Sequence, residues 1–128
     1  MLAASYGLFG GAFAPPHMGH LFSALWAAKV HDLGRVLFVP TWENAFGKEP
    51  AASFADRATM TRGLLAQQAA WAGVSTIERS LEAPSRTHRT WTALREKMML
   101  DTDIHLLRLI LGYDLKDRWH DWEIWEQL

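Results

Sequence analysis

Residues 10–20, GGAFAPPHMGH, constrain the fold of this chain more than any other segment. Glycines, prolines and histidines are concentrated there, between two apolar stretches. The preceding residues 5–9, SYGLF, are expected to form a buried strand that runs into a tight turn. After Pro15-Pro16 the apolar residues recur at helical spacing, which predicts an amphipathic helix over residues 18–32 with Leu21, Leu25, Ala28, Trp26 and Val30 on its apolar side. A glycine-rich turn between a strand and a helix is where parallel α/β folds place phosphates.

The residue types in this turn suit a phosphate site. Gly10 and Gly11 let the backbone approach a ligand without a Cβ in the way, and Pro16 suits the start of a helix. His17 and His20 are three apart and share a helical face at the N-terminus, where free N–H groups favour an anion. Both imidazoles could donate hydrogen bonds to phosphate oxygens in a transition state. The alternatives are histidines that only cap the helix, or a metal-binding pair.

The rest of the chain alternates between strand and helix patterns. An apolar side of Met60, Leu64 and Leu65 predicts a helix that begins at residue 54, with Ser53 or Asp56 as its cap. Such alternation indicates βαβ units around a parallel sheet, in a single domain over residues 1–128. The further elements expected are strands over 35–39, 74–78 and 104–111, and helices over 54–71, 87–100 and 114–128.

The composition limits which binding partners and which cellular location are expected. The chain has 128 residues, no cysteine and a net charge of −1, so neither disulfides nor a general affinity for nucleic acid is expected. Its N-terminus lacks the basic region of a signal peptide, and no stretch approaches the roughly 18 apolar residues of a membrane span. A cytoplasmic protein without a membrane partner is therefore predicted.

Residues 10–20 resemble the GG-[ST]-F-[DN]-P-x-H-x-G-H signature of the HxGH nucleotidyltransferases, and the chain is most similar in pattern to the nicotinate-nucleotide adenylyltransferases. The resemblance implies a Rossmann-like (HUP-type) three-layer α/β fold with a parallel sheet of at least four strands. It also implies transfer of a nucleotidyl group from an NTP to a phosphate-bearing acceptor, with release of pyrophosphate. Ala12 and Ala14 depart from the signature, at positions whose usual polar side chains brace the loop.

The resemblance assigns roles to residues. His17 and His20 are the expected catalytic pair and stabilise the transferred and leaving phosphates. Mg²⁺ is expected to arrive bound to ATP, and no protein side chain is predicted as a metal ligand. The expected nucleotide-binding residues are Gly10, Gly11, Ala12, Phe13, Gly19, Gly112 and Asp114, of which Asp114 is also placed beside the acceptor.

Later segments resemble the part of the family that binds the acceptor. Residues 85–90 (SRTHRT) resemble its S-Y-T-x-x-T segment with Arg86 in place of tyrosine, and residues 112–114 followed by Trp122 resemble its G-x-D and stacking tryptophan. The expected acceptor-binding residues are Lys48, Ser85, Arg86, Thr87 and Trp122.

Several residues in the segments that resemble the family also have an interpretation without a role in binding. Lys48 could be a solvated loop residue, and Arg57 could make only surface ion pairs of little energetic value. Thr87, Thr90 and Asp114 could simply cap helices.

The family's second signature, I-S-S-T-x-I-R, does not occur in the 128 residues, so a C-terminally shortened form of the fold is expected. A partner subunit that supplies it, a degenerate binder and a truncated gene product remain open. The favoured hypothesis is an enzyme that transfers AMP to nicotinate mononucleotide, with phosphopantetheine as the alternative acceptor. The others are a nucleotide-binding homologue without catalysis and a homo-oligomer that completes its sheet with a second chain.

Overall fold

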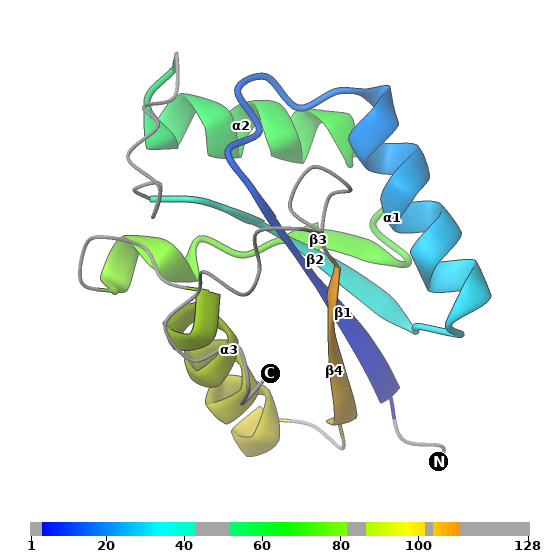
Figure 1. Ribbon diagram of the computed structural model, residues 1–128. Coiled ribbons are helices and arrows are strands. Elements are labelled where there is room, and N and C mark those ends of the chain that lie inside the picture. Colours follow the sequence, from blue (N-terminus) through cyan, green and yellow to red (C-terminus); the bar gives the residue numbers. More distant parts are fainter. Residues whose placement is uncertain (1–3, 43–51, 82–86, 102–103, 111–128) are drawn as a thin grey trace, which may run out of the picture.

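A computed structural model describes residues 4–42, 52–81, 87–101 and 104–110 (Figure 1). The predicted helix over 114–128 lies outside these residues. The strands are β1 (Ala4–Gly11), β2 (Arg35–Pro40), β3 (Ala72–Val74) and β4 (Ile104–Ile110). The helices are α1 (Met18–Val30), α2 (Phe54–Leu64) and α3 (Thr87–Asp101), together with the 3₁₀ helix η1 (Ile77–Ser80).

The four strands form one parallel sheet in the order β3-β2-β1-β4, which confirms the predicted sheet of at least four parallel strands. After β3 the chain returns across the sheet to place β4 on the other side of β1. The strand order therefore reverses beside β1, and ligands of open α/β sheets bind at the carboxyl edge of such a switch point. Gly11 pairs with Pro40 and Phe9 with Ile110, so the three strands end close to the same level.

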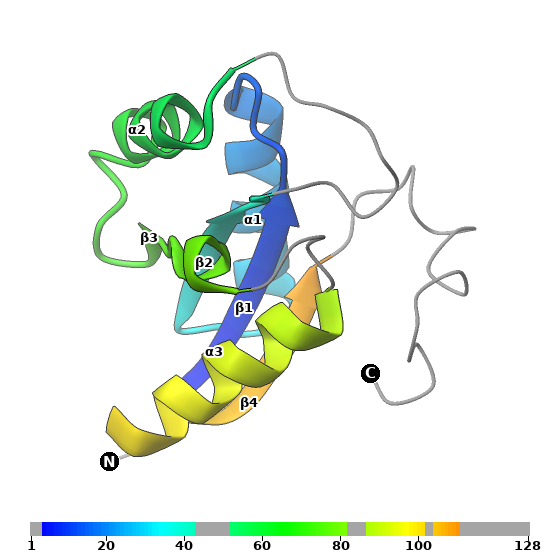
Figure 2. The same ribbon diagram turned by 90° about the vertical axis from the view of Figure 1, so that its left-hand side faces the viewer.

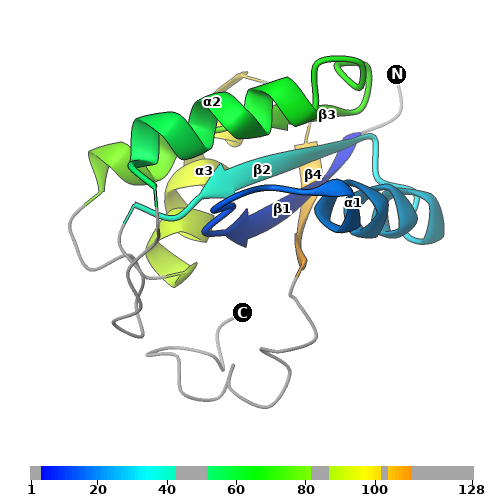
Figure 3. The ribbon, with the colours of Figure 1, turned by 90° about the horizontal axis from the view of Figure 1, so that it is seen from above.

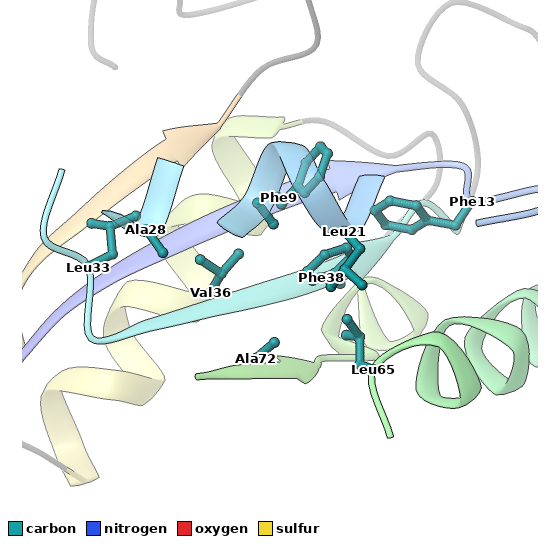
Figure 4. Packing of buried hydrophobic residues seen from close by; sticks show 10 residues of the cluster. Phe9, Phe13, Leu21, Ala28, Leu33, Val36, Phe38, Leu65 and Ala72 are labelled. Atoms are coloured by element: carbon teal, nitrogen blue, oxygen red, sulfur yellow. The ribbon is translucent and has the colours of Figure 1, made fainter. Parts of the chain in front are cut away.

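Helices cover both faces of the sheet, as Figures 2 and 3 show for α1 and α3 on opposite sides of β1. Alternation along the strands supplies both cores, because successive side chains point to opposite faces. Phe9, Val36 and Phe38 belong to the core beneath α1, drawn in Figure 4, where Leu65 from the end of α2 joins them. Leu8 and Val39 belong to the core beneath α3. This three-layer arrangement is the Rossmann-like fold that was predicted.

The third strand differs from the prediction of residues 74–78. It runs over Ala72–Val74, and Ile77–Ser80 forms η1 instead. The ladder to β2 ends where the Ser75 N–H donates to the carbonyl of Phe38 at 2.9 Å. Pro40, the next residue of β2 on that side, has no N–H to donate, so the pairing cannot continue.

Helix α2 ends at Leu64, not at residue 71 as predicted. The carbonyl of Trp71 accepts a hydrogen bond from the Val36 N–H at 2.8 Å, so residue 71 is already hydrogen-bonded to the edge of β2. The prediction that Met60 lies on the buried side of this helix was also wrong. Met60 is exposed, and the buried residues of α2 are Arg57, Ala58 and Thr61.

Helix α1 packs on the sheet through small residues. Its buried side chains are Leu21, Ala24, Ala27 and Ala28. Trp26 and Val30, which the helical pattern placed with the buried residues, are 64% and 54% exposed. In the part of the chain described here, no helix is both long and apolar enough to cross a membrane.

Candidate active site

His17 caps helix α1 with its own ring. Its backbone is extended (φ −146°, ψ 176°), and its Nδ1 accepts a hydrogen bond from the Gly19 N–H at 3.1 Å. His20, three residues on, accepts a hydrogen bond from the His17 N–H through Nδ1 at 3.0 Å. The two bonds form a capping box made from histidines. The interpretation of these residues as helix caps is therefore correct, and it does not exclude a role in catalysis.

The caps determine where each imidazole carries its proton. A neutral imidazole has one N–H, and a nitrogen that accepts a hydrogen bond cannot carry it. Since Nδ1 is the acceptor in both His17 and His20, the proton lies on Nε2 in each ring. The rings are stacked, with centroids 3.8 Å apart and an interplanar angle of 22°. The site therefore presents two adjacent Nε2–H donors at a helix N-terminus, where a phosphate is favoured.

Burial keeps His20 neutral. Partial desolvation lowers the pKa of His20 below the usual histidine value, and the electrostatic influence of the His17 ring lowers it further. The ring also contacts Phe13 edge-on, with centroids 5.0 Å apart. Because the pKa is lowered, His20 stays uncharged at neutral pH and donates from Nε2 without carrying a permanent positive charge.

Phe13 holds the turn in a conformation that few large residues adopt. Its φ is 51°, in the left-handed region, and its side chain is only 2% exposed. Its ring contacts Phe9 and Phe38 at centroid distances of 5.7 and 5.5 Å. Aromatic packing therefore offsets the strain that this backbone conformation costs. Phe13 thus fixes the conformation of the loop by packing its side chain into the core.

The glycines of the loop differ in what surrounds them. A Cβ on Gly10 would make only ordinary van der Waals contacts, with Leu8 Cδ2 at 3.8 Å and the Val39 carbonyl oxygen at 3.9 Å, and Gly10 is exposed near the end of β1. A Cβ on Gly11 would come within 3.3 Å of the Phe13 ring. A Cβ on Gly19 would come within 2.9 Å of His17 Cε1 and Nδ1. The observed position of the His17 ring thus requires a glycine at position 19.

Replacing Gly19 with alanine should lower turnover on the order of 100-fold, because the new Cβ displaces the His17 ring. Stability should change little, since the better helix propensity of alanine, about 1 kcal/mol, offsets a lost cap of similar size. Urea unfolding and steady-state kinetics measure the two effects. Gly63→Ala is the matched control, because a Cβ on this α2 residue has nothing within 4 Å. Full turnover in Gly19→Ala would show that the observed ring position is not needed.

Arg57 corrects the expectation of a residue with only surface ion pairs. It is 2% exposed. Its Nη1 donates to the carbonyls of Ala12 and Thr41, both at 2.8 Å, and its Nε donates to the carbonyl of Ala52 at 3.0 Å. Ser53 caps α2 by accepting from the Asp56 N–H, as predicted. The guanidinium therefore braces the loop that the alanine at position 12 leaves without a side-chain brace.

Glu78 is a residue that sequence reasoning missed. It is 7% exposed in η1; its Oε1 accepts from the Trp42 N–H at 3.0 Å and its Oε2 from the Thr90 hydroxyl at 2.8 Å. Thr90 is buried within α3 and does not act as its cap. The sequence signal was weak, because Glu78 fell at the end of a segment that reads as an ordinary strand.

The structure places one group of predicted site residues together. They lie at the end of β1, in the turn that follows it and at the start of α1: Gly10, Gly11, Ala12, Phe13, His17, Gly19 and His20. Thr87 begins α3, without a described side chain. The other predicted site residues lie outside the described part of the chain: Lys48, Ser85, Arg86, Gly112, Asp114 and Trp122.

Known proteins resemble this chain over most of its length. A probable nicotinate-nucleotide adenylyltransferase of Myxococcus xanthus is 34% identical over 98% of this chain and 65% of its own. A protein of the same name from Anaeromyxobacter sp. (strain K) is 33% identical over 94% of this chain and 63% of its own. The chain thus spans less than two thirds of the length of these relatives.

The fold has a solved counterpart. The Plasmodium falciparum nicotinic acid mononucleotide adenylyltransferase, complexed with NaAD, superposes with a TM-score of 0.75 over 97% of this chain and 59% of that one. At 15% identity, this similarity supports the fold alone. Residues 8–124 match the cytidylyltransferase-like family, and this match includes the complete turn between β1 and α1. The chain therefore belongs to the cytidylyltransferase-like family.

Proposed function

We propose that this chain carries the nucleotidyl-transfer site of an adenylyltransferase that joins AMP from ATP to nicotinate mononucleotide and releases pyrophosphate. The observation that carries the proposal is the pair of Nε2–H donors on His17 and His20, which the two backbone caps orient at the N-terminus of α1. The named relatives support the choice of ATP and nicotinate mononucleotide as substrates.

The reaction needs no covalent enzyme intermediate. A phosphate oxygen of the acceptor attacks the α-phosphorus of ATP in line. The bond from that phosphorus to the oxygen bridging the α- and β-phosphates breaks as the new bond forms. Pyrophosphate leaves with the bonding electron pair, and AMP remains on the acceptor. Negative charge grows on the transferred and leaving phosphates, where His17 and His20 donate hydrogen bonds.

Gly10 is exposed at the end of β1, and the dipole of α1 favours phosphates at the N-terminus of that helix. Magnesium enters as part of the MgATP substrate. Among the described residues there is no group of three or more histidine, aspartate or glutamate side chains that could hold a metal. Lys48, Ser85, Arg86, Thr87 and Trp122 remain the proposed contacts to the acceptor, and Gly112 and Asp114 those to the nucleotide.

The test is pyrophosphate release from MgATP with nicotinate mononucleotide, with phosphopantetheine as a second acceptor and His20→Ala as the control. Release that needs nicotinate mononucleotide and disappears in His20→Ala is the expected result. Release with phosphopantetheine alone would reassign the acceptor. ATP binding without release from either acceptor would instead support a nucleotide-binding homologue, the candidate that Ala12 and Ala14 favour.

A further inference from the structure

The peptide between Thr41 and Trp42 is held by two charged side chains. Its carbonyl accepts a hydrogen bond from Arg57 Nη1 at 2.8 Å, and its N–H donates to Glu78 Oε1 at 3.0 Å. The C=O and N–H of a trans peptide point in opposite directions. The guanidinium and the carboxylate therefore reach this peptide, one residue beyond the end of β2, from opposite sides.

On the guanidinium side, the same Arg57 nitrogen also donates to the carbonyl of Ala12, at 2.8 Å. The Thr41 N–H adds a backbone bond to the carbonyl of Gly11 at 2.9 Å. Arg57 Nε donates to Ala52, which fixes the guanidinium to the approach to α2. The segment after β2 is thus joined directly to the loop of residues 10–20 (the phosphate loop).

On the carboxylate side, the connection continues to α3. Glu78 Oε2 accepts a hydrogen bond from the Thr90 hydroxyl at 2.8 Å, and Thr90 is 1% exposed in the first turn of α3. This turn follows residues 85 and 86, two of the proposed acceptor contacts. One chain of hydrogen bonds therefore links the phosphate loop to the segment proposed to bind the acceptor.

Buried charges are an expensive way to satisfy backbone groups. Burial lowers the pKa of Arg57, and the negative charge of Glu78 counteracts that shift. A buried ion pair is weak evidence for stability, since well-packed apolar residues often serve as well. At this edge the strands have ended, and the carbonyls of Ala12 and Thr41 and the N–H of Trp42 find their partners in side chains. Their hydrogen bonds to backbone groups are explained if Arg57 and Glu78 hold these loops in position.

We propose that Arg57 and Glu78 are positioning residues that clamp the Thr41–Trp42 peptide and so hold the phosphate loop and the first turn of α3 at a set separation. The expected effect of this clamp on turnover rests on the proposed function. The expected effect on ATP binding rests only on the contacts described above. Neither residue touches the reacting atoms.

The matched variants are Thr90→Val, which removes the hydroxyl at nearly constant shape, and Thr90→Ser, which keeps it. Thr90→Val should raise the KM for nicotinate mononucleotide on the order of tenfold, the effect of one hydrogen bond to a charged group, and should raise the KM for ATP by a smaller factor. Arg57→Lys should raise the KM for ATP instead, because an ammonium cannot reproduce the fork of the guanidinium. A merely structural role would lower the melting temperature and leave both KM values unchanged, and that result would overturn the proposal.

A second measurement does not depend on turnover. ATP dissociation constants of the wild type, Arg57→Lys, Thr90→Val and the double variant form a double-mutant cycle. The clamp predicts a coupling of at least about threefold between the two sites, and additive effects would overturn it. If the wild type does not bind ATP, the proposed function fails, and hydrogen exchange at the Trp42 amide replaces the cycle. Faster exchange at Trp42 in Thr90→Val than in Thr90→Ser supports the clamp, and equal rates overturn it.

Discussion

Replacing His20 with asparagine should lower the rate of pyrophosphate release on the order of 10²–10³-fold, the usual effect of removing one oriented donor from a transition-state phosphate site. Asparagine Oδ1 can occupy the place of Nδ1 and keep the hydrogen bond from the His17 N–H. It has no atom at the place of Nε2, so the outward donor is lost. Steady-state release of pyrophosphate and urea unfolding, measured on the same samples, separate the two roles of the ring.

His20→Gln is the matched control, because its amide nitrogen reaches the place of Nε2 while its chain leaves the place of Nδ1 empty. We expect the glutamine variant to turn over faster than the asparagine variant. Both lose the ring contact with Phe13, so each should be destabilised by about 1 kcal/mol. Equal turnover in the two variants would contradict the assignment of Nε2–H as the donor to phosphate.

Replacing Phe38 with alanine should lower the free energy of unfolding by about 3–5 kcal/mol, because a fully buried ring leaves a cavity that its neighbours cannot fill. Phe38 is 0% exposed, and its ring contacts Phe9 and Phe13 at centroid distances of 5.2 and 5.5 Å. The loss is a large fraction of the stability of a small domain. It should also weaken ATP binding, since Phe13 loses support for its left-handed backbone.

Urea unfolding followed by circular dichroism measures this change as a lower midpoint at constant slope. Phe22→Ala is the control, because Phe22 lies on α1 and is 60% exposed. Its substitution should change the free energy of unfolding by no more than about 0.5 kcal/mol. A cost for Phe38→Ala as small as that for Phe22→Ala would mean that the core beneath α1 is not packed as Figure 4 shows.

The turn between β1 and α1 was predictable residue by residue, because its constraints are local. A glycine pair that ends an apolar strand and a proline before a helical pattern depend only on neighbours in sequence. The spacing of three predicted a shared helical face for His17 and His20; the structure stacks their rings, although His17 precedes α1 and has an extended backbone. The parallel sheet of at least four strands was predicted from the resemblance and from the alternation of elements, and the observed sheet agrees.

The charged network behind this turn was not predictable, because each of its bonds joins segments distant in sequence. Arg57 reaches a carbonyl 45 residues away at Ala12, and Glu78 reaches an N–H 36 residues away at Trp42. Helical spacing also misjudged Met60 and Trp26, since it identifies apolar positions but not which of them faces the sheet. Alanines on α1 and a threonine on α2 took the buried places, where small side chains allow close approach.

The sequence by itself determined the class of fold and the glycine-rich turn before α1, and it indicated the proposed catalytic pair, because local spacing and backbone chemistry are sufficient for each. Only the tertiary structure decided the end of β3 and the use of Arg57 and Glu78 as braces. The physical reason is that buried polar groups must be satisfied by whichever partner the fold brings within hydrogen-bonding distance. That partner is set by the packing of the sheet and helices, and spacing along the chain does not encode it.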